Sequence, residues 1–339
     1  MTKNQNLTIR FAQPNDINRI STFIHDNWNK NHIMAKSQEI LKYYHFINKD
    51  FRFVLAEDTI TQKIYGICGY IQSNENNKSD LWTVIWKTIK SPNIMLGLDI
   101  FNFIKNETGC RIISSCGINP ATIPIYEFMN FYTGKLDHYY RLNDKINYNI
   151  AVVNNKILKK VENTNYKIIT FDCFDELTKK FDFSKYKNRK PYKDKFYLKY
   201  RYFNHTIYKY KILGIKNTDD VINSILVGRE ICIHSTKILR LVDFIGIDSD
   251  LGQISYELDR LIQNNDYEYI DFYCHGIDKE IMKNSGMNLR TETDVNIIQN
   301  YYEPFEQKNV DIYYFTSDDD RFYMFKADGD QDRPSILTY

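Results

Sequence analysis

The chain has 339 residues, more than a single domain of ordinary size contains, which predicts two domains. Hydrophobic residues make up 43% and charged residues 26% of the sequence, with only 13 glycines and 7 prolines; this excludes disorder, collagen-like repeats and a disulfide scaffold. The formal charge of +2 gives no basis for binding a nucleic-acid phosphate backbone, so we expect no nucleic-acid partner.

The sequence predicts a cytoplasmic protein that does not insert into a membrane. No apolar run approaches the roughly 20 residues that cross a bilayer, and residues 1–10 lack the apolar segment of a signal peptide. The six cysteines stand singly, without a CxxC pair or another spacing that collects metal ligands. We therefore expect reduced thiols and no metal site.

The first 150 residues alternate between strand and helix patterns. Residues 7–12 alternate as a strand does, and apolar residues recur at helical spacing from Ile17 to Trp28. The following patterns predict a helix over 37–47, paired strands over 51–58 and 63–73, a strand over 81–90, a helix over 92–107, a strand over 110–118, a short helix over 121–130 and a strand over 135–144.

The second half repeats this order of elements. Strand patterns cover residues 166–171, 208–215, 224–236 and 238–247, and a helix is expected over 251–261. A strand over 267–277, a short helix over 278–287, and strands over 295–305 and 310–317 follow. We therefore expect an α/β fold that arose by internal duplication, with a mixed sheet flanked by helices in each of the two domains, 1–150 and 151–339.

The loop after the strand over 81–90 has the pattern of an anion-binding turn. A tight loop that feeds a helix N-terminus presents unpaired backbone N–H groups, here from Asn93 to Gly97, and these suit a pyrophosphate. The strand that leads into it places three side chains on one face in a regular strand: Trp82, Val84 and Trp86.

The first half resembles the GCN5-related N-acyltransferase superfamily over roughly residues 6–145. The resemblance lies in the order of elements, in the loop that ends at Gly97, and in the spacing of Asn119, Thr122, Tyr126, Asn130 and Phe131. The superfamily's pyrophosphate loop has the pattern Gln/Arg-x-x-Gly-x-Gly/Ala. Only its last glycine is matched here, since the equivalent positions are Pro92, Met95 and Gly97.

The resemblance implies tandem units of this fold and acetyl-CoA as the acyl donor. The pyrophosphate would lie over the loop, and strand amides would polarise the thioester carbonyl. Asn119 would bind the pantetheine arm, and Tyr126 would protonate the departing thiolate. The cofactor-binding positions implied in the loop and strand are Trp86, Thr88, Ile89, Asn93, Ile94, Met95 and Gly97.

The sequence marks no single residue as the general base that accepts the proton of the attacking amine. Glu57 stands at the end of one expected strand and His138 within another, and we take both as candidates. A chain of water molecules could replace them.

The second half has an acidic loop where the first half has its anion-binding loop. Asp248 and Asp250 would repel a pyrophosphate, so we expect this half to bind no CoA. Its ionisable groups at strand ends suit a sugar carrying hydroxyls and an amine. The residues expected to bind this acceptor are Arg201, His205, Asp243, His275 and Glu303, and the acidic tail at 328–333 either orders a terminal turn or contacts substrate.

The leading functional hypothesis is an N-acyltransferase, with acetyl the expected acyl group, that modifies an amino sugar, free or linked to a nucleotide. The tail and two polar segments resemble acyltransferase-like proteins of surface-polysaccharide synthesis. Two alternatives stay open: an aminoacyl-tRNA-dependent transferase of the peptidoglycan type, and a non-catalytic binding protein of a glycan pathway.

Overall fold

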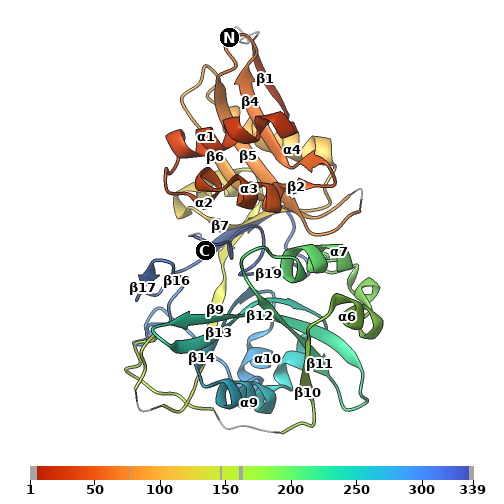
Figure 1. Cartoon of the computed structure of the whole chain (residues 1–339), viewed down its shortest axis with the longest axis vertical. Coiled ribbons are helices and arrows are strands. Elements are labelled where there is room, and N and C mark those ends of the chain that lie inside the picture. The colour runs from red at the N-terminus through yellow and green to blue at the C-terminus, as the bar shows by residue number, and fades with distance from the viewer. Residues whose placement is uncertain (1–5, 77, 146, 160–162, 336–339) are drawn as a thin grey trace.

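The computed structural model describes residues 6–76, 78–145, 147–159 and 163–335, which form two mixed sheets that lie one above the other along the long axis (Figure 1). The expected α/β class with two mixed sheets and flanking helices is therefore confirmed. None of the helices in the described ranges has the length and hydropathy that a membrane crossing requires.

The first sheet has seven strands, all antiparallel to their neighbours except for the parallel pair β6–β7. Helices α1, α2 and α3 pack on one face and α4 on the other. In sheet order the strands are β1 (Leu7–Phe11), β4 (Phe53–Asp58), β5 (Ile64–Gln72), β6 (Leu81–Thr88), β7 (Ile113–Ile118), β18 (Tyr313–Thr316) and β8 (Tyr132–Lys135). The helices are α1 (Ile17–Asn27), α2 (Ile33–Lys36), α3 (Gln38–His45), α4 (Leu96–Thr108) and α5 (Ile123–Phe128).

The second sheet repeats the same sequence of pairings, with β13–β14 as its parallel pair. In sheet order its strands are β10 (Lys167–Phe171), β11 (Tyr210–Lys216), β12 (Ile222–Ile233), β13 (Thr236–Ile245), β14 (Tyr267–His275), β9 (Asp137–Leu142) and β15 (Asn288–Leu289), and β19 (Met324–Phe325) also pairs with β14. Its helices are α6 (Phe174–Lys180), α7 (Lys195–Leu198), α8 (Asp248–Gly252), α9 (Ser255–Asn265) and α10 (Lys279–Asn284), and Lys199–Phe203 form a π-helix.

The two halves exchange one strand each. β9 follows β8 in the chain but lies between β14 and β15 of the second sheet, and β18 from the C-terminal half lies between β7 and β8 of the first. The border between the sheets therefore does not follow the expected border at residue 150. One buried cluster joins the halves, because it contains Trp82 of β6, Tyr197 of α7 and Val242 of β13.

Two expected elements differ in the structure. The single helix expected over 251–261 is two helices, α8 and α9. The strand expected over 295–305 contributes only the short pair β16 (Tyr301–Tyr302) and β17 (Phe305–Glu306), and a similar pair near the N-terminus is β2 (Phe46–Ile47) with β3 (Asp50–Phe51). Backbone carbonyl groups that would pair with a neighbouring strand bind a side chain here. Arg240 donates hydrogen bonds to the carbonyl oxygens of Gln299 and Asn300.

Candidate active site

The two parallel strands of the first sheet separate after a short contact. β6 and β7 pair only at Leu81 with Ile113 and at Trp82 with Ser114. Beyond these pairs, within the described chain, the facing edge of β6 has no strand partner and borders a gap. Backbone groups at such an edge are free to bind a ligand.

A bulge in β6 changes the face of the sheet on which its later side chains lie. Ile85 has a left-handed φ of 49°, and the register between β5 and β6 shifts at this position. Trp82 and Val84 consequently pack on the face of α1 and α3, whereas Trp86 packs on the face of α4. The expectation that Trp86 shares a face with Trp82 and Val84 is therefore wrong, because it assumed a regular strand.

Backbone amides of β6 lie along this gap. The amide of Ile89 donates to the carbonyl oxygen of Tyr65 in 2.9 Å and is directed at β5. Alternation along the strand then directs the amides of Thr88 and Trp86 toward the gap. The amides of Trp86 and Thr88 remain candidate donors, and the expected contribution of the Ile89 amide is corrected because that amide is bound to Tyr65.

The N-terminus of α4 lies beside the gap on the face of Trp86. The Asn93 side chain accepts a hydrogen bond from the amide of Met95 (2.9 Å), and the Asn93 carbonyl accepts one from Leu96 (3.3 Å). Among the described residues the amides of Gly97 and Leu98 have no acceptor, which leaves two donors for a phosphate. The side chains of Ile94 and Met95 are exposed and add no charge to this site.

Tyr126 and Asn119 border the same face. The Tyr126 ring stacks on Phe315 of the exchanged strand at 4.0 Å between centroids and lies 6.3 Å from the Trp86 ring. Burial raises the pKa of Tyr126, so the phenol keeps its proton at neutral pH. Asn119 is exposed and accepts a hydrogen bond from the amide of Ala121, so its side-chain NH₂ group is the part that can meet a ligand.

Glu57 is bound by two arginines at the outer edge of the sheet. Its carboxylate accepts from Arg10 at 2.7 Å and from Arg19 at 2.5 Å, and the residue is only 4% exposed. Both guanidinium groups also bind Asp16. Glu57 lies on β4, two strands away from the gap between β6 and β7, so the geometry does not support its expected role as general base.

His138 lies in β9 and therefore in the second sheet. Its Nε2 atom is 3.0 Å from Asp271, and its ring stacks on Tyr273. Burial lowers the pKa of His138 to about 4, and the strand exchange places the residue in the interior of the other half. The expected role of His138 as general base is corrected for this reason.

The C-terminal tail covers the gap from the face opposite α4. A Cβ atom at Gly329 would lie 3.1 Å from Val84, and one at Gly117 of β7 would lie 1.6 Å from the Gln331 side chain. The amide of Ala327 donates to Val242 of β13 in 2.9 Å, so the tail contacts both sheets. The gap thus has α4 and Tyr126 on one face and the tail on the other.

A buried triad fixes the tail. Lys193 Nζ lies 2.5 Å from a carboxylate oxygen of Asp243 and 2.5 Å from one of Asp328. One ammonium group thus serves two carboxylates out of contact with solvent, and burial with the neighbouring Asp243 raises the pKa of Asp328 to about 7. Lys326 is also buried, with Gln331 O at 3.3 Å from Nζ, and burial lowers the pKa of Lys326 to about 7.

Four of the five residues expected to bind the acceptor surround the tail. Asp243 belongs to the triad, and Arg201 and His205 both contact the Tyr44 hydroxyl, at 2.9 and 3.2 Å. His205 Nδ1 accepts from two backbone amides, and burial lowers the pKa of His205 to about 3, so the ring is neutral. His275 is the exception: it pairs with Met324 of β19, and its Nε2 atom lies 2.9 Å from the Tyr314 hydroxyl.

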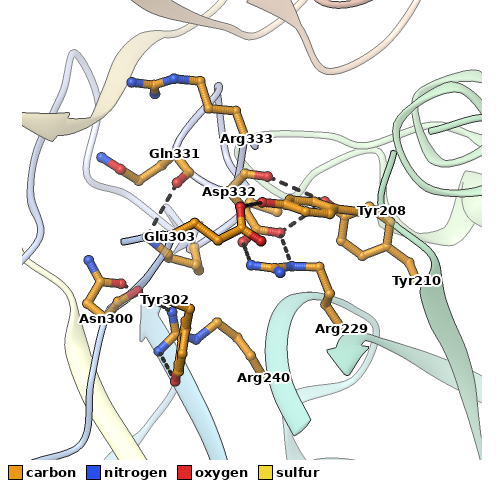
Figure 2. Close-up of polar contacts among 12 residues, drawn as sticks. Tyr208, Tyr210, Arg229, Arg240, Asn300, Tyr302, Glu303, Gln331, Asp332 and Arg333 are labelled. Carbon is orange, nitrogen blue, oxygen red and sulfur yellow. Dashed lines mark hydrogen bonds and ion pairs between the residues drawn. The ribbon is translucent and has the colours of Figure 1, made fainter. Parts of the chain in front are cut away.

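Glu303 adjoins a second ion pair of the tail. Figure 2 shows the Asp332 carboxylate between Tyr210 (2.9 Å) and Arg229 (2.9 Å), with Glu303 beside them. The Tyr208 hydroxyl donates to Glu303 at 3.4 Å, and Arg229 lies 4.0 Å from the centroid of the Tyr208 ring. Sequence patterns gave no indication of Lys193 or Arg229, because each is defined by a partner distant in the chain.

Solved acetyltransferase structures share this fold. A GCN5-related N-acetyltransferase from Anabaena variabilis aligns over 91% of this chain and 72% of its own length, with a TM-score of 0.55 and 10% identity. A probable N-acyltransferase from Enterococcus faecalis aligns over 92% and 72%, with a TM-score of 0.56 and 8% identity. The likeness covers both sheets and shows the GCN5-related N-acetyltransferase fold. No family model and no curated protein matches the sequence.

Proposed function

We propose that this protein is an N-acyltransferase that moves an acyl group, acetyl in the first instance, from acyl-CoA to an amine. The observation that carries the proposal is the gap between β6 and β7, which has free strand amides at its edge and is bordered on both faces. The donor approaches from the α4 face, where the amides of Gly97 and Leu98 are open. The acceptor approaches from the face of the tail.

The chemistry follows from this placement. The amine nitrogen attacks the thioester carbonyl carbon, a C–N bond forms and the C–S bond breaks. Amides of Trp86 and Thr88 stabilise the negative charge on the carbonyl oxygen. Tyr126 keeps its proton at neutral pH and donates it to the departing thiolate. The proton of the amine passes to water, since Glu57 and His138 are held elsewhere.

The acceptor in this proposal is an amino sugar, free or nucleotide-linked, and the pathway is surface-glycan synthesis. Ionisable groups around the tail support it, because Arg201 and Glu303 lie beside the tail. The carboxylate of Asp243 is buried and bound by Lys193 and Tyr202, so Asp243 would act by holding the tail. Positioning both substrates across one gap supplies much of the rate, since bound reactants behave as though highly concentrated.

A ligand-binding experiment tests the donor. The melting temperature of the full chain is measured with acetyl-CoA, with free CoA and with uncharged tRNA, because a specific ligand stabilises the folded state by mass action. We expect a shift with both CoA compounds. A shift with tRNA alone would favour the aminoacyl-tRNA alternative, and no shift with any of the three would favour a binding protein.

A second measurement tests the reaction. Release of the CoA thiol is followed with acetyl-CoA and a panel of amino sugars and nucleotide-linked amino sugars. Thiol release that depends on the amine supports the transferase. Release that is the same with and without every amine would contradict it.

A further inference from the structure

A cavity at the junction of the halves lies outside the gap itself. Its volume is about 20 Å³, room for one or two water molecules, and it opens to solvent. Segments around α3 and β5 form one wall, and α7 with the π-helix forms the other. The lining residues are Tyr43, Tyr44, Ile47, Arg52, Ile71, Gln72, Asn74, Phe196, Tyr197, Tyr200 and Arg201.

Arg52 brings an unpaired positive charge to this cavity. The residue is 8% exposed, and among the described residues its guanidinium group has neither a hydrogen bond nor an ion pair. The neighbouring acids Asp50 and Glu75 are exposed and lie beyond the 4.0 Å of an ion pair. Burial lowers the pKa of Arg52, and a buried cation of this kind is costly unless an anion accompanies it.

Arg201 adds a second guanidinium group without a carboxylate in contact. It is 3% exposed and donates to the Tyr44 hydroxyl (2.9 Å) and to the Ala327 carbonyl oxygen (3.1 Å). Its Nε atom has no acceptor within the described chain, and neither has the buried hydroxyl of Tyr197. Tyr44 gives partial compensation, since its ring centroid lies 4.9 Å from the guanidinium carbon.

The wall of the cavity packs against the acceptor face of the gap. Arg201 binds the tail through Ala327, and the Tyr197 ring lies 5.6 Å from the Trp82 ring on β6. Trp82 belongs to the face of the first sheet that the tail covers. A group held in the cavity would therefore lie beside an amine that enters the gap from this face.

We propose that Arg52 and Arg201 bind an anionic group of the acyl acceptor, a carboxylate or a phosphate, in this cavity. The assignment of the ligand to the acceptor rests on the proposed transferase function. Guanidinium groups are suited to both anions because their planar donors match two oxygens at once. Aromatic side chains line the rest of the cavity, which leaves room for a small charged group and not for a ring attached to it.

Anion binding is tested without acyl-CoA or turnover. The melting temperature of the full chain is followed during titration with inorganic phosphate and with acetate, against chloride at equal ionic strength. We expect saturable stabilisation by at least one of them, and the stronger probe distinguishes a phosphate site from a carboxylate site. Absence of a saturable shift with both would overturn the proposal.

Arg52→Met gives the decisive variant. We expect at least about a tenfold loss of affinity for the anion, since a charged hydrogen-bonding partner is removed. The unliganded variant should melt no lower than the wild type, because an unpaired buried charge has gone. Arg260→Met is the matched control, since Arg260 is exposed on α9 and pairs with Glu257, and it should retain the full anion response. Equal responses in both variants would contradict the site.

The design separates this proposal from the transferase. Acetyl-CoA should still stabilise Arg52→Met, and a missing CoA response in the wild type would contradict the transferase alone. Arg52→Gln serves as a second variant in case methionine disturbs packing, with the same loss expected. With an active enzyme, Arg52→Met should raise KM for an anionic amine at least about tenfold and leave KM for a neutral amine unchanged.

Discussion

The two sheets have the same order of pairings but differ at their parallel pair. In the first sheet, β6 and β7 pair at two positions and then separate. In the second, the pairing of β13 and β14 runs from Lys237 to Leu241, and a buried ion pair of 2.5 Å between Arg240 and Asp271 spans the two strands. The first sheet has therefore opened a gap where the second stays paired, and beyond Leu241 the C-terminal segment closes the second, because β19 pairs with β14 and the Ala327 amide donates to Val242.

The loops that follow β6 and β13 also differ, because one leaves backbone amides open and the other fills the equivalent place with side chains. At α4 the first-turn amides of Gly97 and Leu98 are open. At α8 the Asp248 carboxylate occupies the turn and accepts from Arg189 at 2.7 Å and Tyr323 at 2.8 Å, while Asp250 accepts from Ser224 at 2.6 Å. The comparison teaches that a duplicated architecture can keep a ligand site in one copy and replace it with an internal polar network in the other.

Loss of the buried triad of Lys193, Asp243 and Asp328 should have the largest effect. The triad joins the second sheet to the tail, and the tail covers the gap of the first sheet. Lys193→Met leaves Asp243 and Asp328 facing each other without a cation. We expect the free energy of unfolding to fall by about 3–5 kcal/mol at neutral pH. Urea denaturation measures it, with the exposed pair variant Lys180→Met as control. A loss no larger than that of the control would show that the triad does not fasten the tail.

The buried amine of Lys326 should make the junction sensitive to pH. Its pKa falls to about 7 in the folded state, from 10.5, so between pH 7 and 10.5 the unfolded chain binds the extra proton and stability rises with pH. Lys326→Met removes this slope, and between pH 7 and 9 the wild type should gain about 2–3 kcal/mol relative to the variant. Urea denaturation at pH 7, 8 and 9 measures it. Equal dependence of stability on pH in the wild type and in Lys326→Met would show that folding does not lower the pKa of Lys326.

A negative charge where the loop enters α4 should make this loop as unfavourable for CoA as the acidic loop of the second half. Gly97→Asp introduces a carboxylate where the second half already has one, and we expect CoA affinity to fall about a hundredfold or more. Gly97→Ala is the control, because a Cβ atom there meets nothing closer than 3.8 Å. Isothermal titration with acetyl-CoA measures both variants together with Asp248→Asn. Unchanged binding by Gly97→Asp, or changed binding by Asp248→Asn, would place the CoA site elsewhere.

Removal of one hydroxyl should give the smallest effect. Tyr126→Phe keeps the ring that stacks on Phe315, so we expect CoA affinity to stay and turnover to fall by about one to two orders of magnitude. Steady-state rates of thiol release measure this, with Tyr132→Phe, an exposed tyrosine on β8, as the control. Equal turnover in the two variants would make Tyr126 a packing residue.

Local patterns predicted most of the elements, because alternation and helical spacing are properties of neighbouring residues. The strands around Leu55 and Leu239 and the helix around Ile100 follow from such patterns. The position of β9 does not, since alternation tells which face is buried but not which sheet receives the strand. The bulge at Ile85 likewise depends on a backbone conformation that the apolar pattern around Trp86 does not reveal.

The candidate site could be predicted only in part for the same reason. Asn93 and Gly97 follow from a local strand–loop–helix pattern. Arg201 and Asp243 were expected beside the acceptor, and the structure brings both to the tail, although their binding role is a proposal. No sequence pattern pointed to Lys193 or Arg52. The partners of Lys193 are distant in the chain, and Arg52 stands out only because its guanidinium group has no ionic partner in the described structure.

The strand exchange also constrains how the chain can be synthesised. β7 and β8 leave the ribosome early, whereas β18, which pairs with both, follows only after nearly the whole second half. At usual elongation rates of about 5–20 residues per second, that edge of the first sheet stays unpaired for roughly 10–35 seconds. β9 emerges before any strand of the sheet that receives it. Both halves must therefore mature together, and the nascent chain is a natural client for chaperones that shield unpaired strand edges.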